Sequence, residues 1–361
     1  MDVLVIGTYY PDGFATHIAG TFEDMGHTAH RYRAGMTHEG GEGIFRTFWR
    51  KAKSRLHSIG EENAAYRSWW WGSLWQLLEE HDIDLTIVCH DSFLWPEEVE
   101  RIQRKTCGPV ALWFPDHIGN LTRGYCVTAP YDALFFKDPF IVEQLRDLCQ
   151  GEVYHLPQCF SRDGHRLPES TTEEDLVPYR CEITTAGNLH SYRVGLFRQL
   201  TDYNVKLWGN PSPRWMDAGP VQDMFQNRYV TYGEKAKAFR AARIVINNQH
   251  PAEVWGVNKR TFEAAGIGAL QLVTWRPGLD QLFSVGEEIV AYRGIDDLKK
   301  KIDYYLEHDT EREKIANRSK ERAREDHTYH HRLNLMVDTV REKENGYPFP
   351  SDVRRSTQRK F

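Results

Sequence analysis

The stretch MDVLVIGTYYPDGFATHIAGTFEDMGHTAHRYR (Met1–Arg33) contains the pattern that decides the fold. Its run Val3–Gly7 is short, apolar and ends in glycine, which is typical of a buried strand entering a turn. The loop TYYPDGF follows, and then a helically spaced run over Ala15–Met25 that Gly26 ends. Residues 27–33 predict the next strand. Strand, loop, helix, glycine and strand in this order indicate the first unit of a doubly wound α/β domain.

The same alternation continues to about residue 160 and starts again at residue 182. The predicted strands are Ile83–Cys89, Pro109–Phe114, Tyr131–Phe136, Val153–Leu156, Glu182–Ala186, Val205–Trp208, Ile244–Asn247, Ala269–Thr274 and Ile289–Tyr292. The predicted helices are Asn63–Glu80, Glu97–Lys105, Pro139–Cys149, His190–Leu200, Gly233–Ala242, Asn258–Ala265, Asp296–Glu307, Glu311–Glu325 and Thr328–Glu344. Apolar strands that alternate with helices predict parallel sheets buried on both faces.

Residues 161–180 interrupt this rhythm with two prolines, one glycine and many charges, which predicts an interdomain linker. We therefore expect a Rossmann-like domain over 1–160, a second one over 181–330, and a helix with a basic tail over 331–361. The length of 361 residues agrees with two domains, since about 150 residues per domain is usual. Two such halves predict a cleft between them, because ligands of these sheets bind at the carboxyl ends of the strands.

The composition excludes several classes of protein. A hydrophobic fraction of 40% can build a core, and a net charge of −5 gives no general reason to expect nucleic acid as a partner. The longest apolar runs are strand-sized, so we expect no transmembrane segment, and Asp2 without a basic region predicts no signal peptide. The six cysteines lie at least ten positions apart, which favours reduced thiols and a cytoplasmic location. The basic, aromatic run Ile44–Leu56 leaves attachment to a membrane surface as an alternative.

Two segments of the second half place polar side chains where strands end. In AGNLHSYR, a Gly-Asn turn that contains Asn188 lets the backbone approach a ligand, and Arg193 lies early in the next helix. In ARIVINNQH, a buried strand ends in Asn247 and Asn248. Arg193 can equally be a solvated helix residue, and the asparagines can be ordinary turn residues. These positions are therefore candidates for ligand binding, with a plain structural alternative for each.

The segment WGVNKRTFEAAGIGAL (255–270) is the most informative for function. Asn258 can cap a helix whose first turn holds Lys259 and Arg260, where cations oppose the helix dipole. Two cations there are explained by a bound anion, and arginine matches phosphate oxygens well. Glu263 shares their face and can form a local salt bridge or accept hydrogen bonds from a ribose diol. Together these residues suggest binding of a nucleoside diphosphate.

Residues 181–331 resemble the CgeB-like (spore maturation protein) glycosyltransferase family. The resemblance is carried by the segments AGNLHSYR, KLWGN, ARIVINNQ, VNKRTFEAAGIGALQLV and the long run from LDQLFSVGEEIV to HTYHHRL, and it extends to the linker start LPQCFSRDGHRLP. The first half resembles the family only in its layout. The resemblance implies a GT-B fold, in which two Rossmann-like domains face each other across a cleft. It also implies transfer of a sugar from a nucleotide-diphosphate sugar, with no required metal and no permanently bound cofactor.

The resemblance also implies roles for residues of the second half. Arg260 would bind the diphosphate and Glu263 the ribose or donor sugar. Donor-binding residues besides these would be Asn188, Arg193, Asn247, Asn248, Asn258 and Lys259. The pattern E-x7-E of many retaining enzymes is absent, because Trp255 stands eight positions before Glu263. The stereochemical outcome is therefore left open.

The first half should supply the acceptor site and a general base, which must reach the acceptor hydroxyl. The candidates follow predicted strands: Asp12 and His17 in the first loop, His90 and Asp91, and Asp116 and His117. Asp116 ranks high because Trp113–Asp116 resembles the W-x-x-D run of the family, and His17 is its main rival. Asp12 is read more simply as a turn residue of the sequence PDG. Tyr9, Tyr10, Trp95 and Trp113 could stack on a sugar or aromatic acceptor near these strand ends.

The leading hypothesis is a metal-independent GT-B glycosyltransferase whose acceptor is a small molecule, a glycan or a protein. One alternative is a nucleotide-sugar epimerase or hydrolase on the same fold. Another is a protein that binds a sugar nucleotide or a glycan without catalysis.

Overall fold

In the computed structural model of this protein, residues 1–34, 60–121, 123–213 and 215–344 are described. The chain divides into two compact units. Unit 1 comprises Met1–Phe114, Thr122–Leu134 and Leu148–Glu152, and unit 2 comprises Pro115–Leu121, Phe135–Asp147 and Val153–Phe361. The basic, aromatic run Ile44–Leu56 and the basic tail lie outside the described residues. The predicted domain boundaries stay a prediction.

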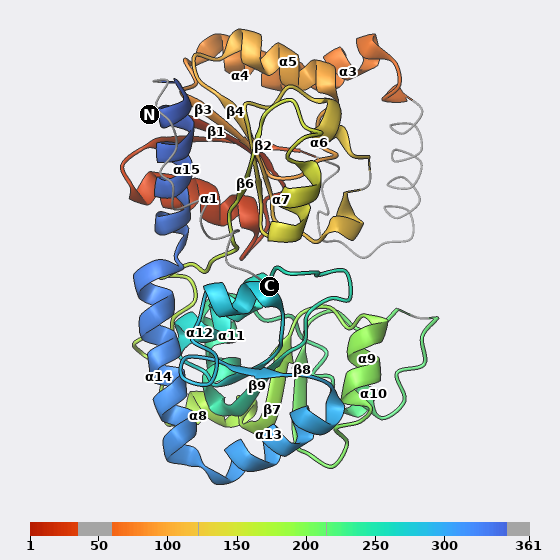
Figure 1. Ribbon diagram of the computed structural model, residues 1–361, viewed down its shortest axis with the longest axis vertical. Coiled ribbons are helices and arrows are strands. Elements are labelled where there is room, and N and C mark those ends of the chain that lie inside the picture. The colour runs from red at the N-terminus through yellow and green to blue at the C-terminus, as the bar shows by residue number, and fades with distance from the viewer. Residues whose placement is uncertain (35–59, 122, 214, 345–361) are drawn as a thin grey trace. The chain divides into compact units, whose positions relative to one another are not determined.

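The first sheet has six strands in the order β2-β1-β3-β4-β5-β6 (Figure 1). The strands are β1 (Asp2–Gly7), β2 (Thr28–Arg33), β3 (Leu85–Val88), β4 (Val110–Phe114), β5 (Ala133–Phe136) and β6 (Glu152–His155). β1 pairs in parallel with β2 and β3, and β3 pairs in parallel with β4. The helices along this part of the chain are α1 (Phe14–Asp24), α3 (Ala64–Trp70), α4 (Gly72–Glu80), α5 (Pro96–Lys105), α6 (Tyr125–Thr128) and α7 (Pro139–Leu145).

The opening pattern forms the expected strand and helix. Val3–Ile6 are fully buried, as the apolar run requires of a central strand. A Cβ on Gly7 would lie 2.5 Å from the Cβ of Ala15, so the glycine permits α1 to pack directly beside the end of β1. The sequence therefore encodes this unit locally, through one glycine and one apolar run.

The second sheet has five strands in the order β11-β10-β9-β7-β8, and all four pairs are parallel. The strands are β7 (Cys181–Ala186), β8 (Val205–Trp208), β9 (Ala242–Asn247), β10 (Gln271–Thr274) and β11 (Val290–Tyr292). The helices are α8 (Glu173–Leu176), α9 (Ser191–Phe197), α10 (Val221–Met224), α11 (Tyr232–Ala241), α12 (Lys259–Ile267), α13 (Ile295–Glu307), α14 (Asp309–Asp326) and α15 (Tyr329–Glu344). The predicted α/β class with two parallel sheets is confirmed.

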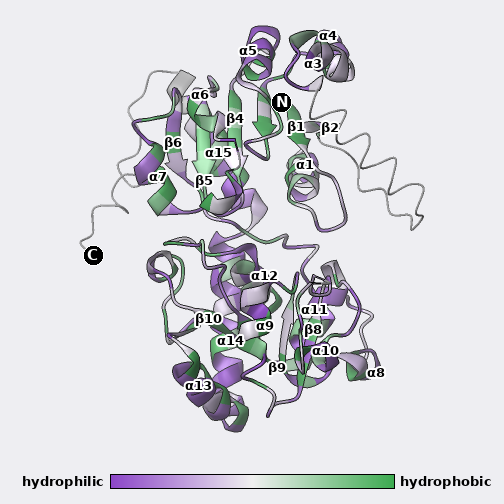
Figure 2. Cartoon of the chain, turned by 90° about the vertical axis from the view of Figure 1, so that its right-hand side faces the viewer, coloured by the Kyte–Doolittle hydropathy of each residue, from purple (hydrophilic) through white to green (hydrophobic). Residues whose placement is uncertain are grey.

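Hydropathy follows this layering. In Figure 2 strands such as β4 and β5 are mainly green, whereas α13 carries much purple on its surface. Burial is complete on β4, where Val110–Phe114 are all 0% exposed. Among the described residues, no helix is long and apolar enough to cross a membrane. All six cysteines are free thiols.

Two predictions differ from the structure. The single helix expected over Asn63–Glu80 is two helices, because the chain bends at Trp71, which ends α3 and precedes α4. Gly266 does not end α12; it lies inside the helix, where a Cβ would meet the ring of Phe160 at 2.1 Å. The helix ends instead at Gly268, whose φ of +80° is left-handed. Residues 161–180, the predicted linker, include α8 and the fully buried His165; their role as a linker stays a prediction.

Candidate functional site: an anion-binding turn cluster in unit 2

The second sheet changes its direction of growth between β7 and β9. From β7 the chain adds β8 on one side and β9, β10 and β11 on the other. Ligands of open parallel sheets bind outside the carboxyl ends of the strands at such a point. β7 runs directly into Gly187 and Asn188, and β9 ends at Asn247, which Asn248 follows. Three predicted donor-binding residues therefore lie where the topology predicts a ligand.

Two glycine turns at this edge pack backbone against backbone. Gly187 follows β7 with φ +127°, and Gly209 follows β8 with φ +142°, conformations that L side chains rarely adopt. A Cβ on Gly209 would lie 2.2 Å from the carbonyl oxygen of Gly187. The Gly187 amide donates to the carbonyl oxygen of Trp208 at 2.8 Å. Both positions therefore require glycine, and the two turns form one rigid floor.

The guanidinium groups of Arg193 on α9 and Arg260 on α12 converge over this floor. A Cβ on Gly187 would lie 2.7 Å from Nη1 of Arg193 and 2.7 Å from Nη2 of Arg260. Arg193 is 4% exposed and Arg260 is half-buried. Among the described residues, neither arginine forms an ion pair, and the buried Nε of Arg193 has no hydrogen-bond partner. Two cations thus meet at one glycine, where the charge of Glu263 compensates that of Arg260 only in part.

The backbone and one side chain hold both guanidinium groups in place. Nε of Arg260 donates to the carbonyl oxygen of Ala186 at 2.7 Å, and its Nη1 donates to Oδ1 of Asn247 at 3.1 Å. Nη1 of Arg193 donates to the carbonyl oxygen of Asn188 at 3.1 Å. Burial, followed by the charge of Arg193, lowers the pKa of Arg260 to about 9. Burial also lowers the pKa of Arg193. A bound anion would relieve this electrostatic cost.

An asparagine network fixes the start of α12 beside the arginines. Oδ1 of Asn258 accepts from the amide of Thr261 at 3.2 Å, which is the predicted helix cap. Nδ2 of Asn258 donates to Oδ1 of Asn247 at 3.0 Å, and Asn247 donates to Oγ1 of Thr261 at 2.9 Å. The positive end of the α12 dipole therefore lies beside Arg260, which adds to the attraction for an anion.

The remaining predicted donor-binding residues differ in their surroundings. Asn188 is exposed, and its Oδ1 accepts from Nδ2 of Asn210 at 2.9 Å. Asn248 is 6% exposed, and its buried Oδ1 has no hydrogen-bond partner among the described residues. A buried amide oxygen without a donor is uncommon in native structures, which marks it as an acceptor for a ligand hydroxyl or amine.

Glu263 lies on α12 with a carboxylate that is held by several cations. Its Oε1 is 3.0 Å from Nζ of Lys235, 3.2 Å from Nζ of Lys259 and 3.4 Å from Nε2 of His165. The residue is 5% exposed. The predicted local salt bridge between Lys259 and Glu263 is present. No local pattern could reveal the contribution of Lys235 and His165, which are distant in the chain. The ribose role of Glu263 stays a prediction.

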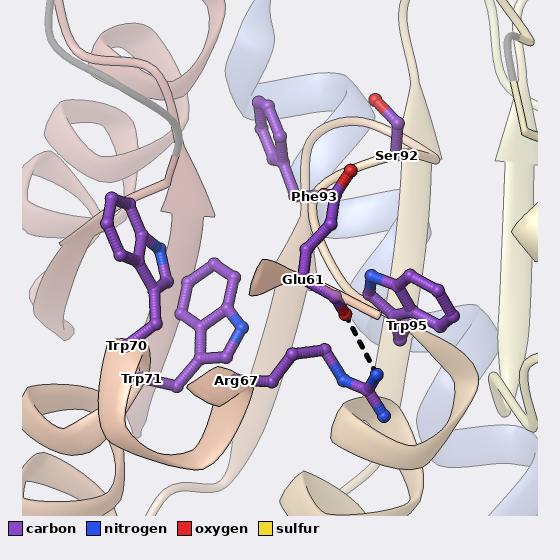
Figure 3. A pocket seen from close by; sticks show the side chains of 7 residues that line it. All are labelled: Glu61, Arg67, Trp70, Trp71, Ser92, Phe93 and Trp95. Atoms are coloured by element: carbon purple, nitrogen blue, oxygen red, sulfur yellow. Dashed lines mark hydrogen bonds between the residues drawn. The ribbon is translucent and has the colours of Figure 1, made fainter. Parts of the chain in front are cut away.

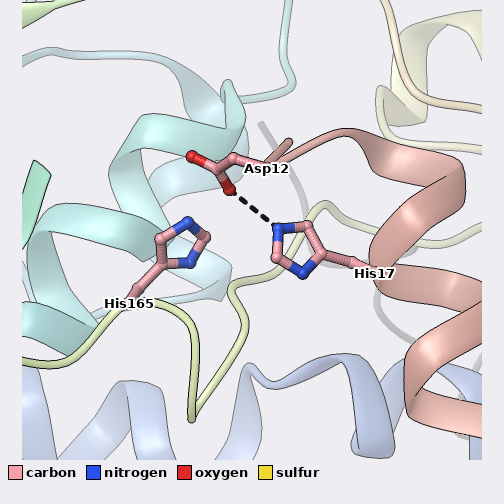
Figure 4. Close-up of side chains that lie close together, drawn as sticks. All are labelled: Asp12, His17 and His165. Atoms are coloured by element: carbon pink, nitrogen blue, oxygen red, sulfur yellow. Dashed lines mark hydrogen bonds and ion pairs between the residues drawn. The ribbon is translucent and has the colours of Figure 1, made fainter. Parts of the chain in front are cut away.

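Of the predicted general bases in unit 1, Asp12 and His17 form a pair (Figure 4). Nε2 of His17 lies 2.7 Å from Oδ1 of Asp12, and both residues are less than 10% exposed. His17 belongs to α1 and not to the preceding loop as expected. Asp12 has φ +62°, so it is the turn residue that PDG predicts and also the partner that orients the imidazole.

The remaining base candidate, Asp116, lies in unit 2, where its Oδ2 accepts from Nδ2 of Asn120 at 3.1 Å. Trp113 is fully buried against Phe14, so the expectation that Trp113 stacks on an acceptor is wrong. Because Trp113 lies in the fully buried strand β4, its side chain packs in the hydrophobic core instead.

Sequence reasoning missed a histidine stack in unit 2. His250 follows β9, and its ring stacks on that of His117 with 3.9 Å between centroids and 5° between planes. Nδ1 of His250 accepts from the amide of Ala252 at 3.1 Å, so a neutral ring carries its proton on Nε2. Burial, followed by the nearby His117, lowers the pKa of His250 to about 4. Tyr192, next to Arg193, contacts the ring of His250 edge-on at 4.9 Å.

A second missed group supports the loop that leads into α12. Nζ of Lys137 contacts Oε1 of Glu253 at 2.5 Å, with both side chains less than 5% exposed. Asp138 accepts hydrogen bonds from the amides of Val254 and Trp255. These partners lie more than 110 positions apart in sequence, so no local pattern could reveal them.

The comparisons with known proteins agree with this fold. Residues 193–338, which include both arginines, match the family described as "Glycosyl transferase-like". The matched segment contains α12 and the α13–α15 region that carried the sequence resemblance. The match and the two-sheet architecture agree with the predicted class: residues 193–338 match a glycosyl transferase-like family, and the fold is that of GT-B enzymes.

Individual relatives support the same conclusion. Spore protein CgeB of Bacillus subtilis is 25% identical over 225 residues, which cover 58% of this chain and 68% of that protein. A structure of HepE from Anabaena in complex with UDP has a TM-score of 0.64 at 13% identity, covering 95% of this chain and all of that one. The glycosyltransferase WaaG, which is involved in lipopolysaccharide biosynthesis, has a TM-score of 0.60 at 14% identity, with 94% and 99% coverage. The predicted resemblance to the CgeB-like family is confirmed.

Proposed function

We propose that unit 2 binds a nucleotide-diphosphate sugar by its diphosphate at Arg193 and Arg260. The observation that carries this proposal is the convergence of both guanidinium groups over Gly187 without a carboxylate partner. Arginine forks bind phosphate oxygens bidentately, and two of them offer enough donors for a diphosphate. Oδ1 of Asn248 then accepts a hydrogen bond from a hydroxyl of the donor, and the carboxylate of Glu263 accepts hydrogen bonds from the ribose.

The reaction is transfer of the sugar to a hydroxyl of an acceptor. As the bond between the anomeric carbon and the diphosphate breaks, negative charge grows on the leaving oxygen. That negative charge is stabilised by the fixed guanidinium groups of Arg193 and Arg260 and by the positive end of the α12 dipole. These fixed cations supply what a metal ion would otherwise provide, so we propose that the transfer needs no metal.

A base must remove the proton from the attacking hydroxyl in an inverting transfer. His17 suits this role because the Asp12 carboxylate, 2.7 Å from its Nε2, orients the ring and stabilises the imidazolium. Asp116 is the second candidate, from its resemblance to the family's W-x-x-D run. The free thiols support a reducing compartment, so we place the reaction in the cytoplasm.

A two-part assay tests the proposal. Thermal unfolding is first measured with UDP-, GDP-, dTDP- and CMP-sugars, and we expect stabilisation by at least one of them, because a ligand of the native state raises its melting temperature. The absence of any shift would contradict donor binding. Release of the nucleoside diphosphate is then measured with and without a panel of acceptors. Release that needs an acceptor supports transfer, whereas release without one favours a hydrolase, interconversion without release favours an epimerase, and binding without turnover favours a binding protein.

A further inference from the structure

The run SWWW (Ser68–Trp71) is not explained by donor binding, and the structure places two of its tryptophans at a hollow in unit 1. Trp70 and Trp71 stand where α3 ends and α4 begins, and the loop after β3 supplies Phe93 and Trp95 opposite them (Figure 3). The hollow includes space that is open to solvent. Trp69, by contrast, is 72% exposed.

The position of this hollow agrees with a ligand site. The first sheet changes its direction of growth between β1 and β3, since β2 lies on one side and β4 on the other. The Asp12–His17 pair follows β1, and the loop with Ser92 and Trp95 follows β3, its paired neighbour. The hollow therefore belongs to the loops at the topological switch point of this sheet, where open α/β sheets bind ligands.

A buried arginine makes the hollow rigid. Arg67 is 6% exposed, and its guanidinium lies 4.4 Å from the ring centroid of Trp95. Its Nε donates to Oε1 of Glu98 at 2.9 Å, and its Nη1 donates to the carbonyl oxygen of Glu61 at 2.9 Å (Figure 3). One side chain thus ties together the segment before α3 and the start of α5. A site that is fixed before binding loses little conformational entropy when the ligand arrives.

Each arginine beside the hollow already pairs with a carboxylate, which argues against an anionic ligand. Arg67 pairs with both Glu97 and Glu98, and the carboxylate of Glu61 pairs with Arg123. What remains is a set of flat aromatic faces with polar atoms between them. Nδ1 of His90 accepts from the Ser92 amide, so the Ser92 hydroxyl donates to the same nitrogen at 3.0 Å and keeps its lone pairs for a ligand.

We propose that this hollow binds a sugar ring of the acceptor, so that the acceptor is a saccharide or a glycoside. A pyranose presents a face of C–H bonds, which packs on indole, and a rim of hydroxyls, which bond to groups such as Glu61 and Ser92. A simple aromatic ligand would use only the indole faces and would make no hydrogen bond to the Ser92 hydroxyl. The proposal rests on the proposed transfer for its biological meaning, but the binding itself is independent of the donor.

Saturation-transfer NMR with the full chain tests the binding directly. The probes are neutral methyl glycosides and oligosaccharides of glucose, galactose, mannose and N-acetylglucosamine at millimolar concentration, with indole and inorganic phosphate as the competing classes. We expect saturation of the ring C–H protons of at least one saccharide. Trp70→Ala should weaken its binding roughly tenfold or more, the usual effect of removing an anchoring aromatic face.

Two controls make the result decisive. Trp69→Ala removes an adjacent but exposed indole and should leave saccharide binding unchanged, and Trp70→Tyr should restore part of it. UDP-induced thermal stabilisation should be the same in Trp70→Ala and wild type, which separates this proposal from donor binding. No saccharide signal in the wild type, binding of indole or phosphate in place of sugars, or equal effects of Trp69→Ala and Trp70→Ala would each overturn the proposal.

Discussion

Arg193 and Arg260 direct their guanidinium nitrogens to the same point above Gly187, each 2.7 Å from where a Cβ would stand. Like charges this close repel, and among the described residues neither guanidinium group forms an ion pair with a carboxylate. The protein retains a locally unfavourable arrangement at the switch point of its second sheet. Such arrangements are typical of functional sites, where stability is lower than the fold could achieve.

Removing one of these charges should therefore stabilise the empty protein while it abolishes nucleotide binding. We expect Arg260→Gln to keep or raise the melting temperature without ligand and to lose the shift caused by UDP or GDP sugars. Arg198→Gln, an exposed residue just after α9, should change neither. A lower melting temperature together with an intact nucleotide shift would show that Arg260 is a structural residue.

Gly187→Ala should damage both stability and binding. The φ of +127° is strained for alanine, and the new methyl group would displace both guanidinium groups. We expect a loss of about 1–3 kcal/mol in urea unfolding, with no detectable nucleotide shift. Gly195→Ala on α9 is the matched control: its added Cβ meets nothing within 4 Å, so it should be neutral or stabilising. Equal behaviour of the two variants would refute the packing argument.

Glu263→Gln separates ribose binding from structural support. The carboxylate sits among Lys235, Lys259 and His165, so its neutralisation leaves cations near a buried position. We expect weaker nucleotide-sugar binding and a lower melting temperature. Unchanged donor affinity in calorimetry would remove Glu263 from the site.

The two candidate bases can be distinguished by kinetics. Replacement of the true base should lower turnover by about 10²–10⁴-fold with little change in donor affinity. We expect this result for His17→Ala, and a smaller loss for Asp12→Asn, which retains a partner for the imidazole. Asp116→Asn should then have little effect on turnover. A large loss in Asp116→Asn with a nearly normal His17→Ala would reverse the assignment.

Stability should fall as the pH drops below neutrality because several histidines are held neutral. His327 is 4% exposed, its Nδ1 accepts from Nη2 of Arg332, and burial followed by that charge lowers its pKa to about 3. In the unfolded chain His327 binds a proton near pH 6.5, whereas in the folded chain it stays neutral down to about pH 3. The free energy of unfolding therefore falls as the pH drops from about 6.5 to 3. His327→Gln should flatten this pH dependence in urea unfolding, and exposed His308→Gln should not. Equal slopes for His327→Gln and wild type would contradict the account.

The sequence was sufficient for the fold where signals were local. The apolar run of β1 with Gly7 and the Asn258 cap of α12 act within a few residues, and both appear as predicted. The end of α12 was misplaced because two glycines stood close together, and only the ring of Phe160, far away in sequence, explains Gly266.

The site was only partly predictable for the same reason. Arg193 and Arg260 were identified from their places at helix starts, but their convergence depends on strand order, which no single segment encodes. The His117–His250 stack and the Lys137–Glu253 pair join segments more than 110 residues apart and carry no local pattern. Long-range contacts thus account for most of what sequence reasoning missed.

The most direct test of the central claim is a calorimetric titration of wild type and Arg260→Gln with UDP, UMP and uridine, repeated with the guanine series. If the two arginines bind a diphosphate, the wild type should prefer the diphosphate over the nucleoside by about two orders of magnitude or more, a difference of roughly 2.8 kcal/mol. Arg260→Gln should lose most of that preference while its weak nucleoside binding remains. The same preference in both proteins, or none in the wild type, would contradict the assignment of this site.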